Sequence, residues 1–220
     1  MWNEKGVILD EGPVDAFRNS LAQLGEGIGE HIETLADNYV WDNEIIRDIP
    51  ILKYLQAGWK IKRNICEKYE MEKIVLFIQE LDKCVQNEKI LQMKEKILSD
   101  PKYLRKESEL ALIALSRFID KNKSKLLAKV LGMFACGNVN AEEYEELVYV
   151  INQINLSDLV TLKLVVDGVN SLVSDKNLSS LNRLLACGVI MQATINANGI
   201  RYNDYEALSI GLKLNDANLL

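Results

Sequence analysis

The sequence predicts a mostly α protein, in which a helical bundle is followed by a small C-terminal module that contains a β-hairpin. Three observations support this fold class. Apolar residues recur at intervals of three and four along most of the chain, only 3 prolines and 12 glycines interrupt its 220 residues, and the last forty residues change to short apolar runs around an Asn-Gly pair. The first spacing is typical of amphipathic helices, and Asn-Gly between apolar runs is typical of hairpin turns.

Residues 1–49 are predicted to form an acidic helical arm. Within 14–38 the apolar side chains follow helical spacing at Phe17, Leu21, Leu24, Ile28, Ile32 and Leu35. Three glycines in this segment weaken a helix by about 1 kcal/mol each relative to alanine, so we expect it to form against a partner surface. Residues 1–50 carry a charge balance of −8 and residues 51–130 one of +7. The arm therefore either packs on the basic body or simply presents its charges to solvent.

Residues 50–154 are predicted to form the helical bundle. Pro50 suits the first turn of a basic amphipathic helix over 50–65. Further helices are expected, in order, over 69–85, 88–98, 102–119, 123–136 and 141–154. In the third of these five segments the apolar stripe is expected to extend to Ile119.

Residues that favour helix ends support these boundaries. Gly137 is expected to end one helix in a left-handed conformation. Asn140 and Glu143, three residues apart, have the spacing of a capping box and predict the start of the next helix.

Residues 155–220 are predicted to form the C-terminal module. A helix from Ser157 to about Val166 is followed by the helix LSSLNRLLACG, an apolar strand, and a hairpin at Asn198-Gly199. The segment ALSIGLKL is expected to add a further strand or turn. A helix, a turn, a second helix and a hairpin make this module winged-helix-like, with Leu208 to Gly211 in the place of the last wing strand.

The sequence offers no constellation of catalytic or metal-ligating residues. The four cysteines are at least 18 residues apart and His31 is the single histidine, which argues against a zinc site and indicates buried thiols. The glycines of LGEGIGE lie in a helical pattern beside two glutamates, which would repel phosphate. The acidic run AEEYEEL fits the positive end of a helix dipole better than a metal site. We therefore expect a protein that is not an enzyme, with no catalytic residue, no cofactor and no metal.

Three groups of residues are candidates for interaction. The first follows the apolar part of 50–65, the second is the lysine-rich turn KNKSK, and the third lies on the second helix of the winged-helix-like module. They are Trp59, Lys60, Lys62 and Arg63; Lys121, Lys123 and Lys125; and Asn182 and Arg183. Lysines at a helix start oppose the helix dipole, so KNKSK is either a hydrated loop, which we favour, or a partner of the acidic arm, or an anion site.

Partners and location follow from charge and hydropathy. A basic amphipathic helix over 50–65 could bind a membrane surface, although its apolar side chains fit a bundle core better. A winged helix could bind DNA, but this module is nearly neutral, so nucleic acid is the less favoured partner. There is no secretory signal and no long uncharged apolar run, which predicts a cytoplasmic protein.

The chain resembles helical proteins of bacteria and their phages, some of them linked to abortive infection, as in the Abi-alpha group. The resemblance lies in the order of the segments IPILKYLQAG…KIVLFIQEL, KLLAKVLGMFACGNVNAEEYEEL, NLSDLVTLK and LNRLLACGVI. The resemblance covers about residues 45–200 and implies a role in anti-phage defence or mobile elements. We expect a non-enzymatic protein-interaction module, either a regulator or an effector, with a protein partner. A homo-oligomer, a membrane-surface effector and a winged-helix DNA-binding regulator are the alternatives.

Overall fold

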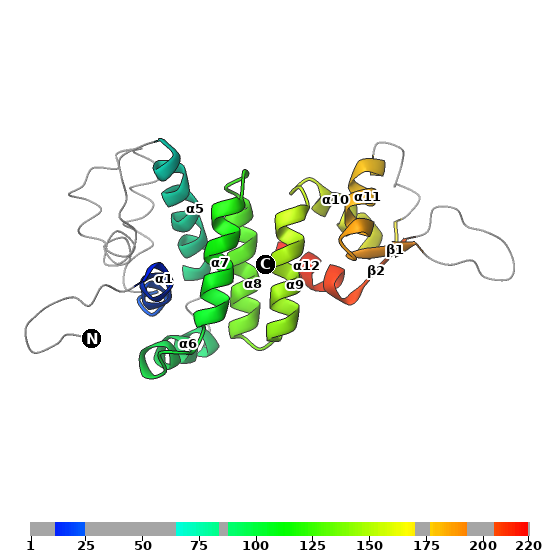
Figure 1. Ribbon diagram of the computed structural model, residues 1–220. Helices are drawn as coiled ribbons and strands as arrows, with labels where there is room; N and C mark the ends of the chain where they lie inside the picture. The colour runs from blue at the N-terminus through cyan, green and yellow to red at the C-terminus, as the bar shows by residue number, and fades with distance from the viewer. Residues whose placement is uncertain (1–11, 25–64, 84–87, 170–176, 193–204, 220) are drawn as a thin grey trace, which may run out of the picture.

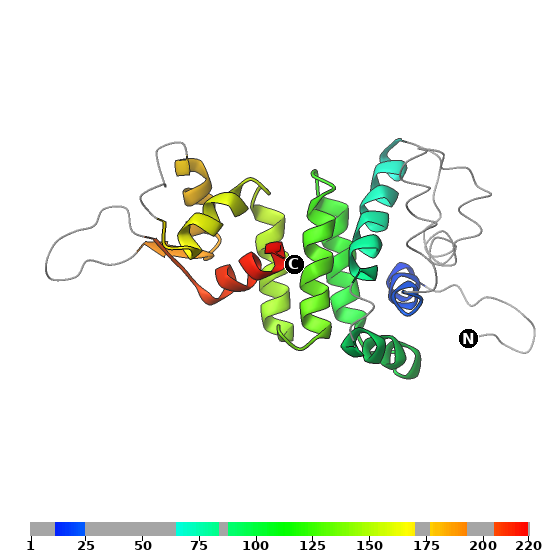
Figure 2. The same ribbon diagram turned by 180° about the vertical axis from the view of Figure 1, so that it is seen from behind.

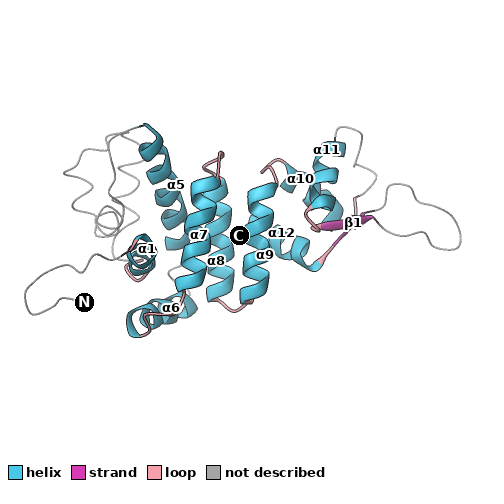
Figure 3. Cartoon of the chain, viewed as in Figure 1, coloured by secondary structure: helices cyan, strands magenta, loops and turns pink. Residues whose placement is uncertain are grey.

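The computed structural model describes residues 12–24, 65–83, 88–169, 177–192 and 205–219 (Figure 1). These residues form helices and one antiparallel β-hairpin, which confirms the predicted fold class (Figure 3). The helices are α1 (Pro13–Leu21), α5 (Ile65–Asp82), α6 (Glu88–Ser99), α7 (Arg105–Arg117), α8 (Lys123–Ala135), α9 (Ala141–Gln153), α10 (Asp158–Val166), α11 (Leu178–Ala186) and α12 (Ser209–Leu219). The strands are β1 (Ile190–Gln192) and β2 (Tyr205–Ala207).

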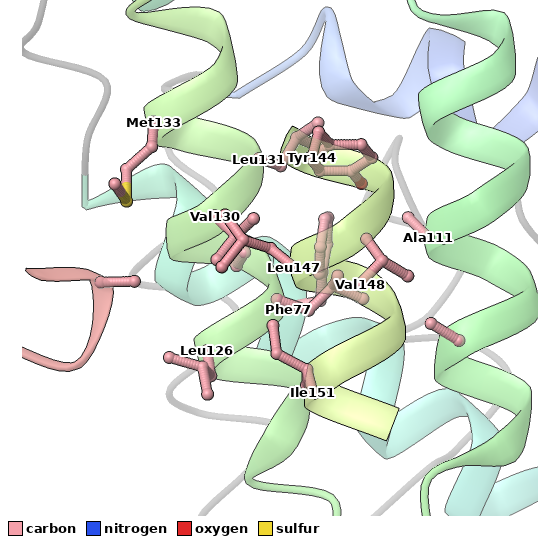
Figure 4. Close-up of a cluster of buried hydrophobic side chains, with 14 of the residues drawn as sticks. Phe77, Ala111, Leu126, Val130, Leu131, Met133, Tyr144, Leu147, Val148 and Ile151 are labelled. Carbon is pink, nitrogen blue, oxygen red and sulfur yellow. The ribbon is translucent and has the colours of Figure 1, made fainter. Parts of the chain in front are cut away.

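The centre of the bundle is formed by α7, α8 and α9, which run up, down and up through two short turns (Figure 1). Helix α5 packs along α8, and α1 packs on α7 and α6. The core between these helices is made of apolar side chains at the predicted helical spacing (Figure 4). Tyr144 is its largest fully buried member, and its hydroxyl donates to the Glu107 carbonyl at 3.3 Å.

Basic side chains from neighbouring elements bind the C-terminal ends of four helices. Arg18 of α1 donates to the Ile97 carbonyl of α6 at 2.9 Å, and Lys73 of α5 donates to the Phe118 carbonyl that ends α7 at 3.2 Å. Lys89 of α6 donates to the Cys136 carbonyl that ends α8, and Lys123 of α8 donates to the Asn152 carbonyl of α9 at 3.1 Å. The last carbonyls of a helix have no partner within it and carry the negative end of its dipole, so a cation there is stabilising.

The turns between the helices have the predicted caps. Gly137 has a φ of +73°, and the Asn138 amide donates to the Met133 carbonyl at 2.9 Å, which is the Schellman arrangement after α8. The Asn140 side chain accepts from the Glu143 amide while the Glu143 carboxylate accepts from the Asn140 amide, so the predicted capping box is confirmed. Glu143 also pairs with Lys213 of α12, which ties the start of α9 to the C-terminal helix.

The C-terminal module is built on the helix pair α10 and α11. Strand β1 follows α11 and pairs antiparallel with β2 in the register Ile190 to Ala207, Met191 to Glu206 and Gln192 to Tyr205. The predicted Asn-Gly turn at 198–199 lies outside the described residues. Helix α12 then packs on α8, α9, α10 and β2, so it joins the module to the bundle (Figure 2).

Two expectations about this chain were wrong. Ala207 of the segment ALSIGLKL ends strand β2, but the residues from Ser209 on belong to helix α12 and not to a strand, because Ile210, Leu214 and Ala217 have helical spacing and all three are buried. The sequence pattern concealed this because Gly211 and the short length of the segment also fit a strand end. Ile119 is 92% exposed instead of in the core, because α7 ends at Arg117 and the chain turns before it.

The described part of residues 1–49 is packed on the bundle. Phe17 and Leu21 of α1 are fully buried, and Phe17 contacts Phe77 of α5 with ring centroids 5.5 Å apart. The three glycines of the predicted arm and the predicted helix over 50–65 lie outside the described residues. The division of the chain at residues 49 and 154 stays a prediction.

Gly211 is predicted to be required for the close packing of α12 on the backbone at Val189. A Cβ at this position would lie 2.2 Å from the Val189 carbonyl oxygen, which is backbone and already accepts a hydrogen bond from the Leu208 amide. Gly211→Ala should therefore lower the free energy of unfolding by about 1–3 kcal/mol, measured by urea denaturation. Gly12→Ala is the matched control, because a Cβ there meets nothing within 4 Å. An equal, small effect of both substitutions would contradict the close packing.

Candidate interaction surfaces

The structure places the predicted interaction residues in very different settings. Trp59, Lys60, Lys62 and Arg63 lie outside the described residues. Lys121 and Lys123 bind other parts of the bundle, and Lys125 is half-buried. Asn182 is exposed on α11, whereas Arg183 is turned toward α10.

The favoured interpretation of KNKSK as a hydrated loop was wrong for Lys123. Its side chain is only 9% exposed, donates to the Asn152 carbonyl, and lies 5.7 Å from the centre of the Phe118 ring. Lys121 donates to the Glu72 carboxylate of α5 at 3.1 Å. The lysines of this turn therefore connect α8 to α5 and α9, which sequence alone did not reveal because Glu72 and Asn152 are distant along the chain.

Asp158 and Arg183 form an ion pair between α10 and α11. Asp158 is fully buried and accepts two hydrogen bonds from the Arg183 guanidinium, at 2.8 and 2.6 Å. It also accepts from the Asn155 amide at 2.8 Å. A bidentate pair of this kind fixes the angle between two helices as well as adding energy. Arg183 is thus engaged within the protein.

Several pKa values shift around this junction. Burial raises the pKa of Asp158, but hydrogen bonds from Arg183, Ser180 and the Asn155 amide outweigh it, and the pKa lies below its usual value. Burial lowers the pKa of Lys123, against the opposite effect of nearby Asp120 and Asp158. Burial raises the pKa of the Cys187 thiol, and Asp158 adds to this. The polar groups of this junction are therefore partly desolvated, and the hydrogen bonds of Asp158 join α10 to α11 within the module.

The winged-helix prediction gives α11 the role of a recognition helix. Its exposed side chains in the described structure are uncharged, namely Leu178, Ser179, Asn182 and Ala186. Affinity for a nucleic acid depends mainly on cations that neutralise phosphates. Since Arg183 is held by Asp158, α11 presents no free cation in the part of the chain that the structure describes, and its exposed face suits phosphate poorly.

A different surface carries exposed apolar side chains, and we call it the α7/α9 outer face. It consists of the solvent-facing sides of α7 and α9, opposite the side that packs on α8 (Figure 1). Ile113 of α7 is 41% exposed and Tyr149 of α9 is 61% exposed. Lys106 and Glu145 form an exposed ion pair across the two helices, so these two residues lie at a similar level.

The helical register brings Ile113 and Tyr149 together on this face. Ile113 lies seven residues beyond Lys106, and Tyr149 lies four beyond Glu145, so their levels along the two helix axes differ by three residues, roughly 4.5 Å. Leu110 of α7 is half-buried at the level of Tyr149. The centre of the α7/α9 outer face is therefore apolar.

Acidic residues border this apolar centre on both sides. Glu109 lies beyond Ile113 on α7, and Glu142 and Glu146 lie beyond Tyr149 on α9, all of them exposed. Within the described ranges none of the three forms an ion pair. On α7, Arg105 and Lys106 lie one turn before Glu109 and are paired with Asp15 and Glu145, and the exposed Arg117 lies one turn beyond Ile113. The α7/α9 outer face thus combines an apolar centre with an acidic border.

The sequence contains a signal for this face. Ile113 and Tyr149 are apolar residues that fall outside the buried stripes of their own helices. Such a residue can be found by periodicity, but whether two of them meet depends on how the helices pack. The acidic run in AEEYEEL was assigned to the helix dipole, and this accounts for the first turn of α9 but not for Glu146.

The described residues supply no other class of site. They contain no cluster of three or more metal-ligating side chains, and none of their helices is long and apolar enough to cross a bilayer. Comparisons with protein-family models, with curated proteins and with solved structures find no match to this chain.

The Asp158–Arg183 pair is predicted to stabilise the module. Arg183→Leu would leave a buried carboxylate without its cation, and the free energy of unfolding should fall by about 2–3 kcal/mol at neutral pH. The expected loss of stability is smaller than for a fully buried ion pair, because the Arg183 side chain is 36% exposed. The control is Lys163→Leu, which breaks the exposed Lys163–Asp167 pair of α10 and should cost at most about 0.5 kcal/mol. Equal losses in urea denaturation would contradict the assignment.

The same pair predicts a pH dependence. The folded-state pKa of Asp158 lies below the unfolded value of about 3.9, so the contribution is complete above about pH 5 and is lost as the pH falls through the folded-state pKa. The difference in unfolding free energy between wild type and Asp158→Asn should therefore shrink as the pH is lowered from 6 to 3. A difference that stays constant over this range would contradict the prediction.

Proposed function

We propose that the protein is a non-enzymatic interaction module, a regulator or an effector, which binds a protein partner through the α7/α9 outer face. The observation that carries the proposal is the apolar centre of Ile113 and Tyr149 within an acidic border. Single exposed apolar residues are normal on proteins, but adjacent ones on two parallel helices form a surface that a partner side chain can cover.

The arrangement suits the docking of a helix. Helices α7 and α9 lie side by side and parallel, and α8 covers them from within the bundle (Figure 1). A further helix can pack on the other side of such a pair, where Ile113 and Tyr149 are exposed and Leu110 is half-buried. Recognition of an amphipathic helix by a helical surface is a recurrent mode of protein binding.

The cellular context that we propose comes from the resemblance in segment order. The resemblance supports a bacterial protein of anti-phage defence or mobile-element biology, and we propose a cytoplasmic location for it. The membrane-surface alternative depends on residues 50–65, which lie outside the described residues. The DNA-binding alternative has less support, since the exposed side chains described on α11 are uncharged.

The proposal is tested in the native host. The full chain and the variant Ile113→Ser/Tyr149→Ser are expressed with the same affinity tag, and co-purifying proteins are quantified by mass spectrometry. At least one partner should be recovered about tenfold less with the variant, because apolar anchors dominate the energy of an interface. Unfolding curves of the two proteins should agree closely, since both side chains are exposed.

The matched control is Leu91→Ser/Leu98→Ser on α6, which also removes two exposed apolar side chains. The same partner should be recovered with this control as with wild type. Equal recovery of every protein by wild type and Ile113→Ser/Tyr149→Ser would contradict the assigned face. Turnover of nucleotide, nucleic acid or peptide by the pure protein would contradict the non-enzymatic role.

A further inference from the structure

We infer that the partner's binding element is a cationic amphipathic helix, with an apolar stripe flanked by lysine or arginine. This inference rests on the proposed function and specifies the partner of the same surface. It is carried by the border of the α7/α9 outer face, where the exposed carboxylates of Glu109, Glu142 and Glu146 have no ion pair among the described residues. Lys106 is already bound by Glu145, so it does not neutralise this border.

The acidic border discriminates between classes of occupant. Phosphates of a nucleic acid or of an anionic lipid would be repelled by the three carboxylates. A second copy of this chain docking by the same face would place its own glutamates against them, because a two-fold interface brings each patch onto itself. Like charges across an interface suppress wrong partners, and opposite charges fix the register of the right one.

The helix geometry determines where the cations must be. Glu109 lies on the outer side of α7, and Glu142 and Glu146 lie on the outer side of α9, with the apolar centre between them. A helix that lies along the centre therefore meets carboxylates on both flanks. Its apolar residues would contact Ile113 and Tyr149 at positions three, four or seven apart, and its lysines would occupy the neighbouring positions.

A selection experiment tests the inference. The probe is a phage-displayed library of 18-residue helical peptides. Leucine is fixed at positions i, i+3 and i+7 of every two helical turns, and each position that flanks this stripe encodes either lysine or glutamate. Selection on the full wild-type chain should enrich lysine over glutamate by about two- to fivefold at the flanking positions, which is the effect of one exposed ion pair on affinity.

Two charge-reversed variants make the test specific. In Glu142→Lys/Glu146→Lys the enrichment of lysine should disappear or invert. Glu88→Lys/Glu95→Lys on α6 is the matched control, because both variants replace two exposed glutamates, one of them in the first turn of its helix. Both change the net charge from −6 to −2. The control should keep the lysine enrichment of wild type.

Each result decides the inference. Lysine enrichment on wild type and on the α6 control, but not on Glu142→Lys/Glu146→Lys, supports it. No binder from any selection, no preference between lysine and glutamate, or equal loss of preference in both variants overturns it. If the host partner depends on Ile113 and Tyr149 while the selection shows no charge preference, the proposed function stands and only the cationic partner is wrong.

Discussion

The fold of this protein depends on buried cations that bind the negative ends of helices. Lys73 is the clearest case, because its side chain is 1% exposed and its ammonium group donates to the Phe118 carbonyl and to the Glu70 carboxylate. A charge in this position costs free energy unless every donor finds a partner. The same device recurs from α1 to α6 and from α8 to α9. An exposed lysine, Lys89 of α6, makes the corresponding contact at the end of α8. Three of these contacts join a helix end to a helix that is not its neighbour in the sequence. The fourth, from Lys123, joins the end of α9 to the helix directly before it. The cations therefore determine which helices meet and at what level, while the apolar core supplies the bulk of the stability.

Sequence reasoning could predict the helices but not these contacts. Periodicity and caps located α5 to α11 within a few residues, because amphipathic spacing, Gly137 and the Asn140–Glu143 box are local properties of the chain. Arg18 and Lys73 looked like ordinary charged residues, since their acceptor carbonyls lie 79 and 45 residues away. Helix α12 was missed because local propensity is a weak signal in a short segment that contains glycine, and its burial against Val189 depends on tertiary packing.

The internal use of cations also explains the character of the surface. Residues 51–130 have a charge balance of +7, which from the sequence indicates a basic body. Lys73 and Lys123 are withdrawn into the bundle, Lys106 is paired with Glu145, and Arg105 lies 3.6 Å from Asp15. The α7/α9 outer face is left acidic around its apolar centre. The charge balance of the sequence therefore favours an anionic partner, whereas the charges on the folded surface favour a cationic one. The proposed recognition of a cationic helix follows from the folded surface.

The central claim is that buried cations at helix C-termini hold the bundle together, and Lys73→Met tests it most directly. Methionine keeps most of the side-chain volume but removes the donor to Phe118, so the free energy of unfolding should fall by about 2 kcal/mol in urea denaturation. Lys83→Met, directly after the end of the same helix, is the control, because Lys83 is exposed and forms a pair with Glu80. It should change the free energy of unfolding by less than about 0.5 kcal/mol. A Lys73→Met protein that is as stable as the Lys83→Met control, or more stable than wild type, would show that the apolar core alone holds the helices in place.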